Sequence, residues 1–203
     1  RVCNYLENER EDNLELEIED ITAKHNLVIS DLDLSDSSKQ SLEKKLSFYL
    51  SSLRKSCFTS EYSLMTKDLI TGLGERMNCH IVSASLSSMG IDSEAVDATE
   101  IIETDNNFGK ANPNMENTEI YSKRKLLTML NAEIIPVVTG FVGATRDFKP
   151  TTLGRGGSDY TASILGRVLG AKEVWIWTDV DGVYSDDPMK NPDAEIIPRL
   201  TFK

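Results

Sequence analysis

The chain has 203 residues and a net charge of −11, with 33 acidic and 22 basic side chains. A chain of this length forms one domain or at most two, and buries roughly 70% of its unfolded surface. The acidic balance excludes a nucleic acid or an anionic membrane as the main partner, because both require a basic footprint. Three cysteines without a CxxC pair and two histidines argue against a disulfide framework or a zinc site and favour the reducing cytoplasm.

The first 65 residues favour helices over strands. Residues 1–20 carry eight acidic and two basic side chains, a run that is typical of a solvated helix face or loop. A second segment, residues 37–55, has apolar side chains at helical spacing and is predicted to form an amphipathic helix that covers a sheet. These side chains are Leu42, Leu46, Tyr49, Leu50 and Leu53.

A further helix is predicted from Thr66, as its N-cap, to about residue 89. Its apolar stripe consists of Leu69, Leu73, Met77, Ile81 and Leu86. Gly72 and Gly74 interrupt this helix, and each costs about 1 kcal/mol relative to Ala. Either the helix begins later, after a turn, or a ligand or another part of the backbone approaches closely.

From residue 94 onward, short apolar runs alternate with helical patterns. Strands are predicted at residues 94–98, 134–138 and 174–178, and helices at residues 119–130 and 160–169. This alternation argues for a parallel sheet with helices on both faces, which collects ligands at the carboxyl ends of its strands. The apolar stretch at residues 134–144 is broken by Pro136 and is far shorter than the ~20 residues of a membrane span.

A glycine-rich segment, residues 151–160 (TTLGRGGSDY), precedes the last predicted helix. Its glycines let a ligand approach the backbone, and the helix N-terminus offers free N–H groups and a positive dipole end. The spacing matches neither GxGxxG nor GxxxxGK[ST], which excludes those two nucleotide-binding motifs. Arg155 is suited to bidentate recognition of a carboxylate or phosphate. A plain glycine turn with Ser158 or Asp159 as the helix cap is the alternative.

A second cluster, residues 177–184 (WTDVDGVY), follows the strand predicted at residues 174–178. Asp179 could order the loop, bind a ribose or lie near a metal. Asp181 and Gly182 alone are typical of a turn, and the spacing of the acids excludes an EF-hand loop.

Taken together, these two segments resemble those of the aspartokinases, members of the amino acid kinase family. Residues 74–76 (GER), 104–109 (TDNNFG) and 137–141 (VVTGF) are similar to aspartokinase segments in the same order. The resemblance is clear over residues 66–203 and loose over residues 1–65. It implies an α/β fold, a three-layer αβα sandwich with a mainly parallel central sheet of the carbamate kinase-like type.

The resemblance also implies an activity. Aspartokinases transfer the γ-phosphoryl group of ATP to the side-chain carboxylate of L-aspartate, the first step toward lysine, threonine and methionine. Mg²⁺ is expected to arrive with ATP and to be held by phosphates and water rather than by protein ligands. The full-length protein is expected to be a homo-oligomer. Alternatives are an amino acid kinase acting on glutamate or acetylglutamate, and a non-catalytic sensor of amino acids or nucleotides on the same fold.

Individual roles follow from the same resemblance. Arg155 is expected to grip the α-carboxylate of the substrate, Glu75 to receive its α-ammonium group, and Asp159 to orient catalytic lysines. The substrate pocket is expected to be lined also by Ser158, Gly156 and Gly157. The positions that match nucleotide-binding residues are Thr178, Asp179 and Tyr184.

The sequence departs from the family pattern in three respects. Gly72 and Leu73 stand where relatives usually carry Ser and an aromatic residue, and Met189 stands where they often carry Arg. The Lys-Phe-Gly-Gly phosphate loop, the Phe-Gly-Ala-Lys segment and the ACT regulatory domains are absent from residues 1–203. We therefore expect an internal fragment of a catalytic domain, incomplete at both ends and inactive on its own.

Overall fold

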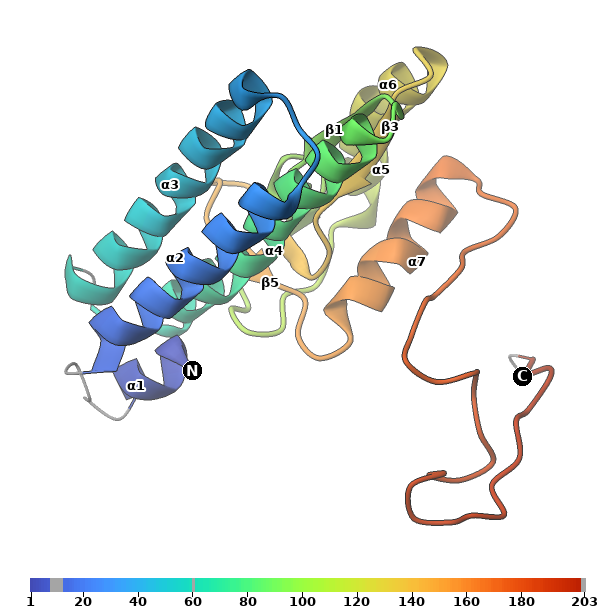
Figure 1. Ribbon diagram of the computed structural model, residues 1–203. Helices are drawn as coiled ribbons and strands as arrows, with labels where there is room; N and C mark the ends of the chain where they lie inside the picture. The colour runs from blue at the N-terminus through green and yellow to red at the C-terminus, as the bar shows by residue number, and fades with distance from the viewer. Residues whose placement is uncertain (8–12, 60, 202–203) are drawn as a thin grey trace. The chain divides into compact units, whose positions relative to one another are not determined.

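The computed structural model describes residues 1–7, 13–59 and 61–201, and divides the chain into two units, Arg1–Lys172 and Glu173–Lys203. In the first unit, strands lie between two groups of helices (Figure 1). One group contains α1 (Val2–Glu7), α2 (Leu14–Asp31), α3 (Asp36–Thr59) and α4 (Leu64–Ser88). The other contains α5 (Met115–Ser122), a π-helical segment (Lys123–Leu127), α6 (Thr128–Asn131) and α7 (Gly157–Leu169). The expected three-layer α/β architecture is confirmed.

The strands form two hydrogen-bonded groups. β1 (Ser93–Val96) and β3 (Ile135–Val138) pair in parallel. β4 (Val142–Thr145) pairs in parallel with β2 (Glu103–Thr104) and antiparallel with β5 (Pro150–Thr152). The sheet structure is therefore mainly parallel, as expected, and among the named strands of the described residues only the β4–β5 pair is antiparallel.

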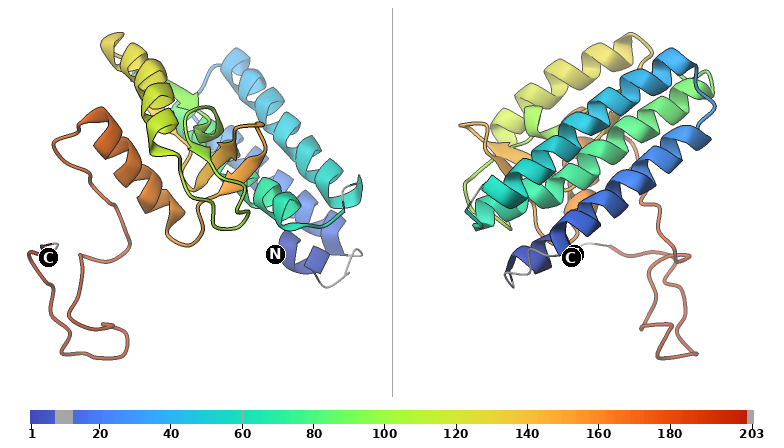
Figure 2. Two further views of the ribbon diagram at one scale, coloured as in Figure 1. Left: turned by 180° about the vertical axis from the view of Figure 1, so that it is seen from behind. Right: turned by 60° about the vertical axis from the view of Figure 1, so that its left-hand side comes forward.

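Helix α3 confirms the helix predicted at residues 37–55, but its predicted position over a sheet is wrong. α2, α3 and α4 run side by side (Figure 2), and α3 packs against α2 and α4. Leu53 joins a core cluster with Leu73 of α4, and Leu46 joins another with Met77 of α4. The apolar stripe of α3 thus meets the apolar stripe of α4, and α4 is the helix that covers the strands.

Helix α4 is continuous, so a helix that begins after the glycines is ruled out. Its N-cap is Ser63, not Thr66 as predicted: the Ser63 side chain accepts a hydrogen bond from the Thr66 N–H group at 3.2 Å. Thr66 instead donates its hydroxyl to the carbonyl of Glu61 at 2.8 Å. A Ser three residues earlier takes the cap because its backbone is extended, whereas Thr66 is already inside the helix.

Gly72 lies where α4 crosses β4. A Cβ atom at this position would lie 2.9 Å from Cγ1 of Val142, which is closer than real side chains approach. At Gly74 a Cβ atom would meet no atom of the described residues within 4 Å. Close approach by another part of the chain therefore explains the first glycine and not the second.

The strand predicted at residues 174–178 is wrong. In the unit Glu173–Lys203, the described residues contain one isolated bridge, between Tyr184 and Ile196. Trp175 and Trp177 are 70% and 85% exposed. A strand that is apolar on both faces forms within a sheet whose two faces are covered by helices. No described strand pairs with this segment.

Two helices begin earlier than predicted. α5 begins at Met115, with Asn114 as its N-cap, instead of at residue 119, and α7 begins at Gly157 instead of residue 160. Among the described residues, no helix has both the length and the hydropathy needed to cross a membrane.

We predict opposite effects for two Gly→Ala substitutions in α4. Gly74→Ala should raise the free energy of unfolding by about 1 kcal/mol, because Ala is the better helix former and the site is open. Gly72→Ala should lower it by about 1–3 kcal/mol, because the new methyl group overpacks against Val142. Urea unfolding of the two variants measures both changes. Equal stabilisation by both substitutions would contradict the close α4–β4 contact, and Val142→Ala should relieve the penalty at Gly72.

Candidate functional site

The glycine-rich turn before α7 requires its glycines. Gly154 and Gly156 have φ values of 79° and 72°, in the left-handed region that side chains disfavour. Gly156 is the N-cap of α7, and the N–H group of Gly157 donates to the Gly154 carbonyl at 3.0 Å. No side chain caps this helix, so the alternative of a Ser158 or Asp159 cap is wrong.

The corner between β3 and β4 supports this turn. A Cβ atom at Gly140 would lie 2.8 Å from Oγ of Ser158, and one at Gly157 would lie 2.7 Å from Cδ2 of Phe141. Phe141 has a φ of 69°, and its N–H group donates to Oγ1 of Thr161 at 3.0 Å. The VVTGF and TTLGRGGSDY segments therefore meet, and both glycines are needed for the contact.

A buried carboxylate, Asp68 of α4, fixes the chain that leads into the turn. It is 2% exposed and accepts three hydrogen bonds. Oδ2 accepts from the N–H groups of Gly109 at 2.8 Å and Thr152 at 3.0 Å, and Oδ1 accepts from the Thr152 hydroxyl at 2.7 Å. A Cβ atom at Gly154 would lie 3.3 Å from the Gly109 carbonyl, so the TDNNFG segment also borders the turn.

A second polar cluster ties α4 to the carboxyl ends of β1 and β3. Nε of Arg76 lies 2.8 Å from Oδ2 of Asp97, as an ion pair rather than a linear hydrogen bond, and the two side chains are 14% and 20% exposed. Nη2 of Arg76 donates to Oγ1 of Thr99 at 3.0 Å. Oγ1 of Thr139, just after β3, accepts from the Ala98 N–H group at 2.7 Å. This is the edge of a parallel sheet where ligands bind.

Glu75 and Arg155 are both charged side chains for which the described part of the chain offers no partner. Glu75 is half-buried, Arg155 is exposed, and neither forms a hydrogen bond or ion pair with another residue in the part of the chain that the structure describes. Burial raises the pKa of the Glu75 carboxyl above its ordinary value of 4.5. A carboxylate in this setting is stabilised by an incoming cation.

The remaining predicted site residues fall into two groups. Ser158 and Asp159 lie exposed in the first turn of α7, beside Gly156 and Gly157. The predicted nucleotide residues Thr178, Asp179 and Tyr184 belong to the second unit, Glu173–Lys203. There the Thr178 hydroxyl donates to Oδ1 of Asp179 at 3.1 Å, and Tyr184 forms the bridge with Ile196.

Sequence reasoning missed Asp68 and Asp97. Asp68 could have been found by its spacing, because it lies seven residues before Glu75 and shares a face of α4 with it. Asp97 could have been found by its place directly after a predicted strand. Within the described residues, no group of three or more His, Cys, Asp and Glu side chains is placed to hold a metal ion.

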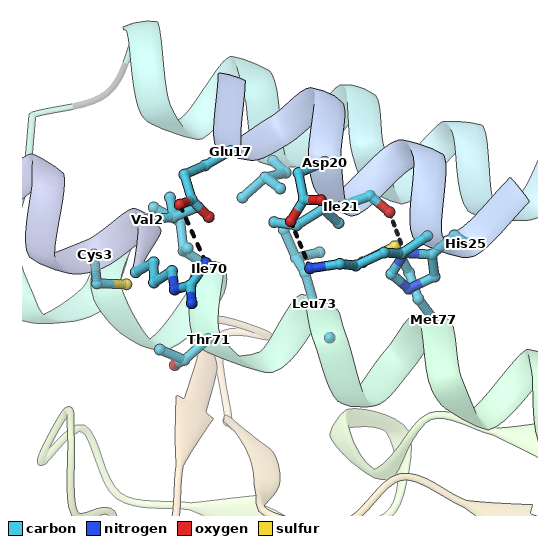
Figure 3. Close-up of a pocket in the computed structure, with 14 residues that line it drawn as sticks. Val2, Cys3, Glu17, Asp20, Ile21, His25, Ile70, Thr71, Leu73 and Met77 are labelled. Atoms are coloured by element: carbon cyan, nitrogen blue, oxygen red, sulfur yellow. Dashed lines mark hydrogen bonds and ion pairs between the residues drawn. The ribbon is translucent and has the colours of Figure 1, made fainter. Parts of the chain in front are cut away.

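A cavity of about 420 Å³ lies between α1, α2 and α4 (Figure 3). Its charged rim is already paired: Arg1 lies 3.7 Å from Glu17, and Lys24 lies 2.6 Å from Asp20. The floor includes Leu73, on the face of α4 that packs against other helices. This cavity adds nothing to the site at the strand ends.

The family model described as the amino acid kinase family matches residues 11–203. The chain belongs to the amino acid kinase family. Within it, the chain is 35% identical to the aspartokinase of Schizosaccharomyces pombe over 159 residues, and 38% identical to aspartokinase 2, chloroplastic, of Arabidopsis thaliana over 164 residues. These alignments cover 77% and 79% of this chain and 30% of each relative. The chain thus spans about a third of the length of the curated relatives it matches.

The structural comparison agrees with the sequence comparison. The crystal structure of Escherichia coli aspartokinase III in complex with aspartate and ADP matches with a TM-score of 0.87 and 26% identity. The match covers 97% of this chain and 44% of that one. The amino acid kinase fold of the chain is therefore shown by its structure as well as by its sequence.

We predict that Glu75→Gln stabilises the fold at pH 7. The raised pKa means that the folded state holds more protons than the unfolded state from pH 4.5 up to the raised value, so stability falls as pH rises through that window. Gln has no charge at any pH, so its burial does not carry the cost of desolvating an ionised carboxylate. Thermal unfolding should therefore give a higher Tm than wild type at pH 7, and a difference that vanishes near pH 3.5. Glu43→Gln, on the exposed face of α3, is the matched control. A lower Tm at pH 7 would show that Glu75 has a stabilising partner in the fold.

Proposed function

We propose that the chain is part of an aspartate kinase, which transfers the γ-phosphoryl group of ATP to the side-chain carboxylate of L-aspartate. The observation that carries this proposal is the pair of unpartnered charges, Glu75 and Arg155. A zwitterionic amino acid needs one fixed anion for its ammonium group and one fixed cation for its carboxylate. The match to Escherichia coli aspartokinase III, solved with aspartate and ADP, supports this pair of substrates.

In this mechanism the protein positions the reactants and neutralises charge. An oxygen of the aspartate side chain attacks the γ-phosphorus of ATP, and the bond to the β–γ bridging oxygen breaks, giving an acyl phosphate and ADP. No general base is required, because a carboxylate nucleophile has no proton to lose. Mg²⁺ arriving with ATP would be held by phosphates and water rather than by protein side chains, and would supply neutralisation of the phosphate charge.

The side chains of this unit hold the amino acid. Arg155 grips the α-carboxylate through its planar fork of N–H donors, and Glu75 receives the α-ammonium group. Ser158 lines the same pocket with Gly156 and Gly157. The N-terminal end of α7 adds a favourable dipole for the negative charge.

The nucleotide and phosphate roles follow the resemblance to aspartokinases. Asp159 orients lysine side chains at the transferring phosphoryl group, and Thr178, Asp179 and Tyr184 hold the nucleotide. The three thiols are free and suit a reducing compartment such as the cytoplasm.

The proposal is tested on the full-length protein that contains this chain, by coupled measurement of ADP release. L-aspartate should support saturable release, whereas L-glutamate and N-acetyl-L-glutamate should not. Saturable turnover with either glutamate compound and none with aspartate would contradict the proposed substrate. No turnover with any of the three would favour a non-catalytic sensor.

We predict that Arg155→Lys lowers kcat/KM for aspartate by about 10- to 150-fold. Lysine keeps the charge but loses the planar fork, and a charged hydrogen bond contributes about 1.5–3 kcal/mol. KM for ATP should change by less than about twofold, because the loss falls on carboxylate recognition. Arg167→Lys, near the other end of α7, is the matched control. An unchanged kcat/KM for aspartate would remove Arg155 from the substrate site.

A further inference from the structure

A second cavity, of about 210 Å³, lies outside the residues of the proposed substrate site. Its walls come from the π-helical segment with the end of α5, from the turn after Asp97, and from the β4–β5 hairpin. The residues used below are Arg124 and Tyr121 from the first wall, Thr99 from the second, and Arg146 from the hairpin.

Two guanidinium groups border this cavity, and neither is paired with a carboxylate among the described residues. Arg124 and Arg146 form no salt bridge or side-chain hydrogen bond with any residue that the structure describes. The guanidinium carbon of Arg124 lies 5.8 Å from the centroid of the Tyr121 ring, a cation–π contact that orients the group without using its N–H donors.

The carboxylates that border the same cavity already have partners. Oε2 of Glu100 lies 2.9 Å from Nζ of Lys125. Oε1 of Glu103 accepts from Nδ2 of Asn117 at 2.7 Å and from Nδ2 of Asn114 at 3.1 Å. The guanidinium groups of the two arginines are therefore charged donors at this cavity with which no described carboxylate is paired.

Both arginines sit on distorted backbone. Arg124 belongs to the π-helical segment Lys123–Leu127, and π-helical turns inside helices occur frequently at functional sites. Arg146 lies in the tight β4–β5 turn, in which Phe148 has a φ of 61°, in the left-handed region that side chains disfavour. The N–H group of Phe148 donates to the Thr145 carbonyl at 2.8 Å, which closes this turn.

We propose that this cavity binds a small molecule with a phosphate or carboxylate group, held between the guanidinium groups of Arg124 and Arg146. Planar N–H forks match the oxygen pairs of both groups. The volume equals about seven water molecules, which fits a pyrophosphate or a four-carbon dicarboxylate. Thr99 borders the cavity, and its Oγ1 also contacts Arg76 and Asp97. Thr99 therefore separates a ligand in this cavity from the Arg76–Asp97 ion pair at the carboxyl end of β1.

Isothermal titration of the 203-residue chain with pyrophosphate and, separately, with succinate tests this proposal. We expect saturable binding of one equivalent of at least one probe, with amide NMR shifts centred on Thr99 and Thr145. The probe that binds distinguishes a phosphate from a carboxylate ligand. Arg124→Gln combined with Arg146→Gln should weaken binding by at least tenfold. The separate Arg→Lys variants, which keep the charge, should weaken it by less.

Two controls separate this site from general electrostatic attraction and from the glycine-rich turn. Lys44→Gln combined with Lys172→Gln removes the same charge from exposed positions elsewhere and should leave binding unchanged. Arg155→Gln should also leave it unchanged. The proposal is overturned if neither probe saturates, if the double arginine variant binds as tightly as wild type, or if binding is lost in Arg155→Gln. Arg155→Gln changes the proposed aspartate site and leaves the second cavity intact. Probe binding by this variant therefore tests the second cavity independently of the proposed aspartate site.

Discussion

The proposed substrate site depends on the hydrogen bonds that the buried Asp68 carboxylate accepts. Asp68 is buried in the first half of α4 and accepts hydrogen bonds from two segments that are far apart in the sequence, at Gly109 and Thr152. Hydrogen bonds to a charged group contribute roughly 1.5–3 kcal/mol each, and a buried donor left alone is destabilising by a similar amount. Since Thr152 leads directly into the glycine-rich turn, the turn takes its position from this one side chain.

Helix α4 carries this arrangement because its polar face, not its apolar face, meets the strands. Leu73 and Met77 pack against α2 and α3. The opposite stripe hydrogen-bonds to the strands: Sγ of Cys79 lies 2.8 Å from the Val137 carbonyl, and the Ser93 hydroxyl of β1 donates to the backbone carbonyl of Ser83 at 2.9 Å. Such bonds fix the rotation of the helix about its axis, which hydrophobic contact alone leaves less defined. That rotation sets where Glu75 and Arg76 project.

The sequence was sufficient for the fold class, for most helices, and for the segments that meet at the glycine-rich turn. The sequence was not sufficient to predict packing partners. Apolar periodicity shows which residues share a face of a helix or strand, but it does not show what that face contacts. The apolar stripe of α3 was predicted correctly, yet it packs against α2 and α4 and not against a sheet. Ser63 and Thr66 are both favoured N-cap residue types, and the extended backbone at Ser63 shows which of them takes the cap. The apolar run at residues 174–178 resembles a buried strand, but strand formation depends on neighbours that its own sequence does not specify.

Native-state hydrogen exchange of the 203-residue chain tests the role of Asp68 most directly. The amide of Gly109 lies in an exposed loop, yet it donates to Asp68. We expect it to be protected by at least about a hundredfold and to exchange with the same opening free energy as the amide of Thr152, since one carboxylate holds both. The neighbouring amide of Asn106, for which the structure shows no acceptor among the described residues, is the internal control. Exchange of Gly109 at the rate of Asn106, with Thr152 still protected, would contradict the account.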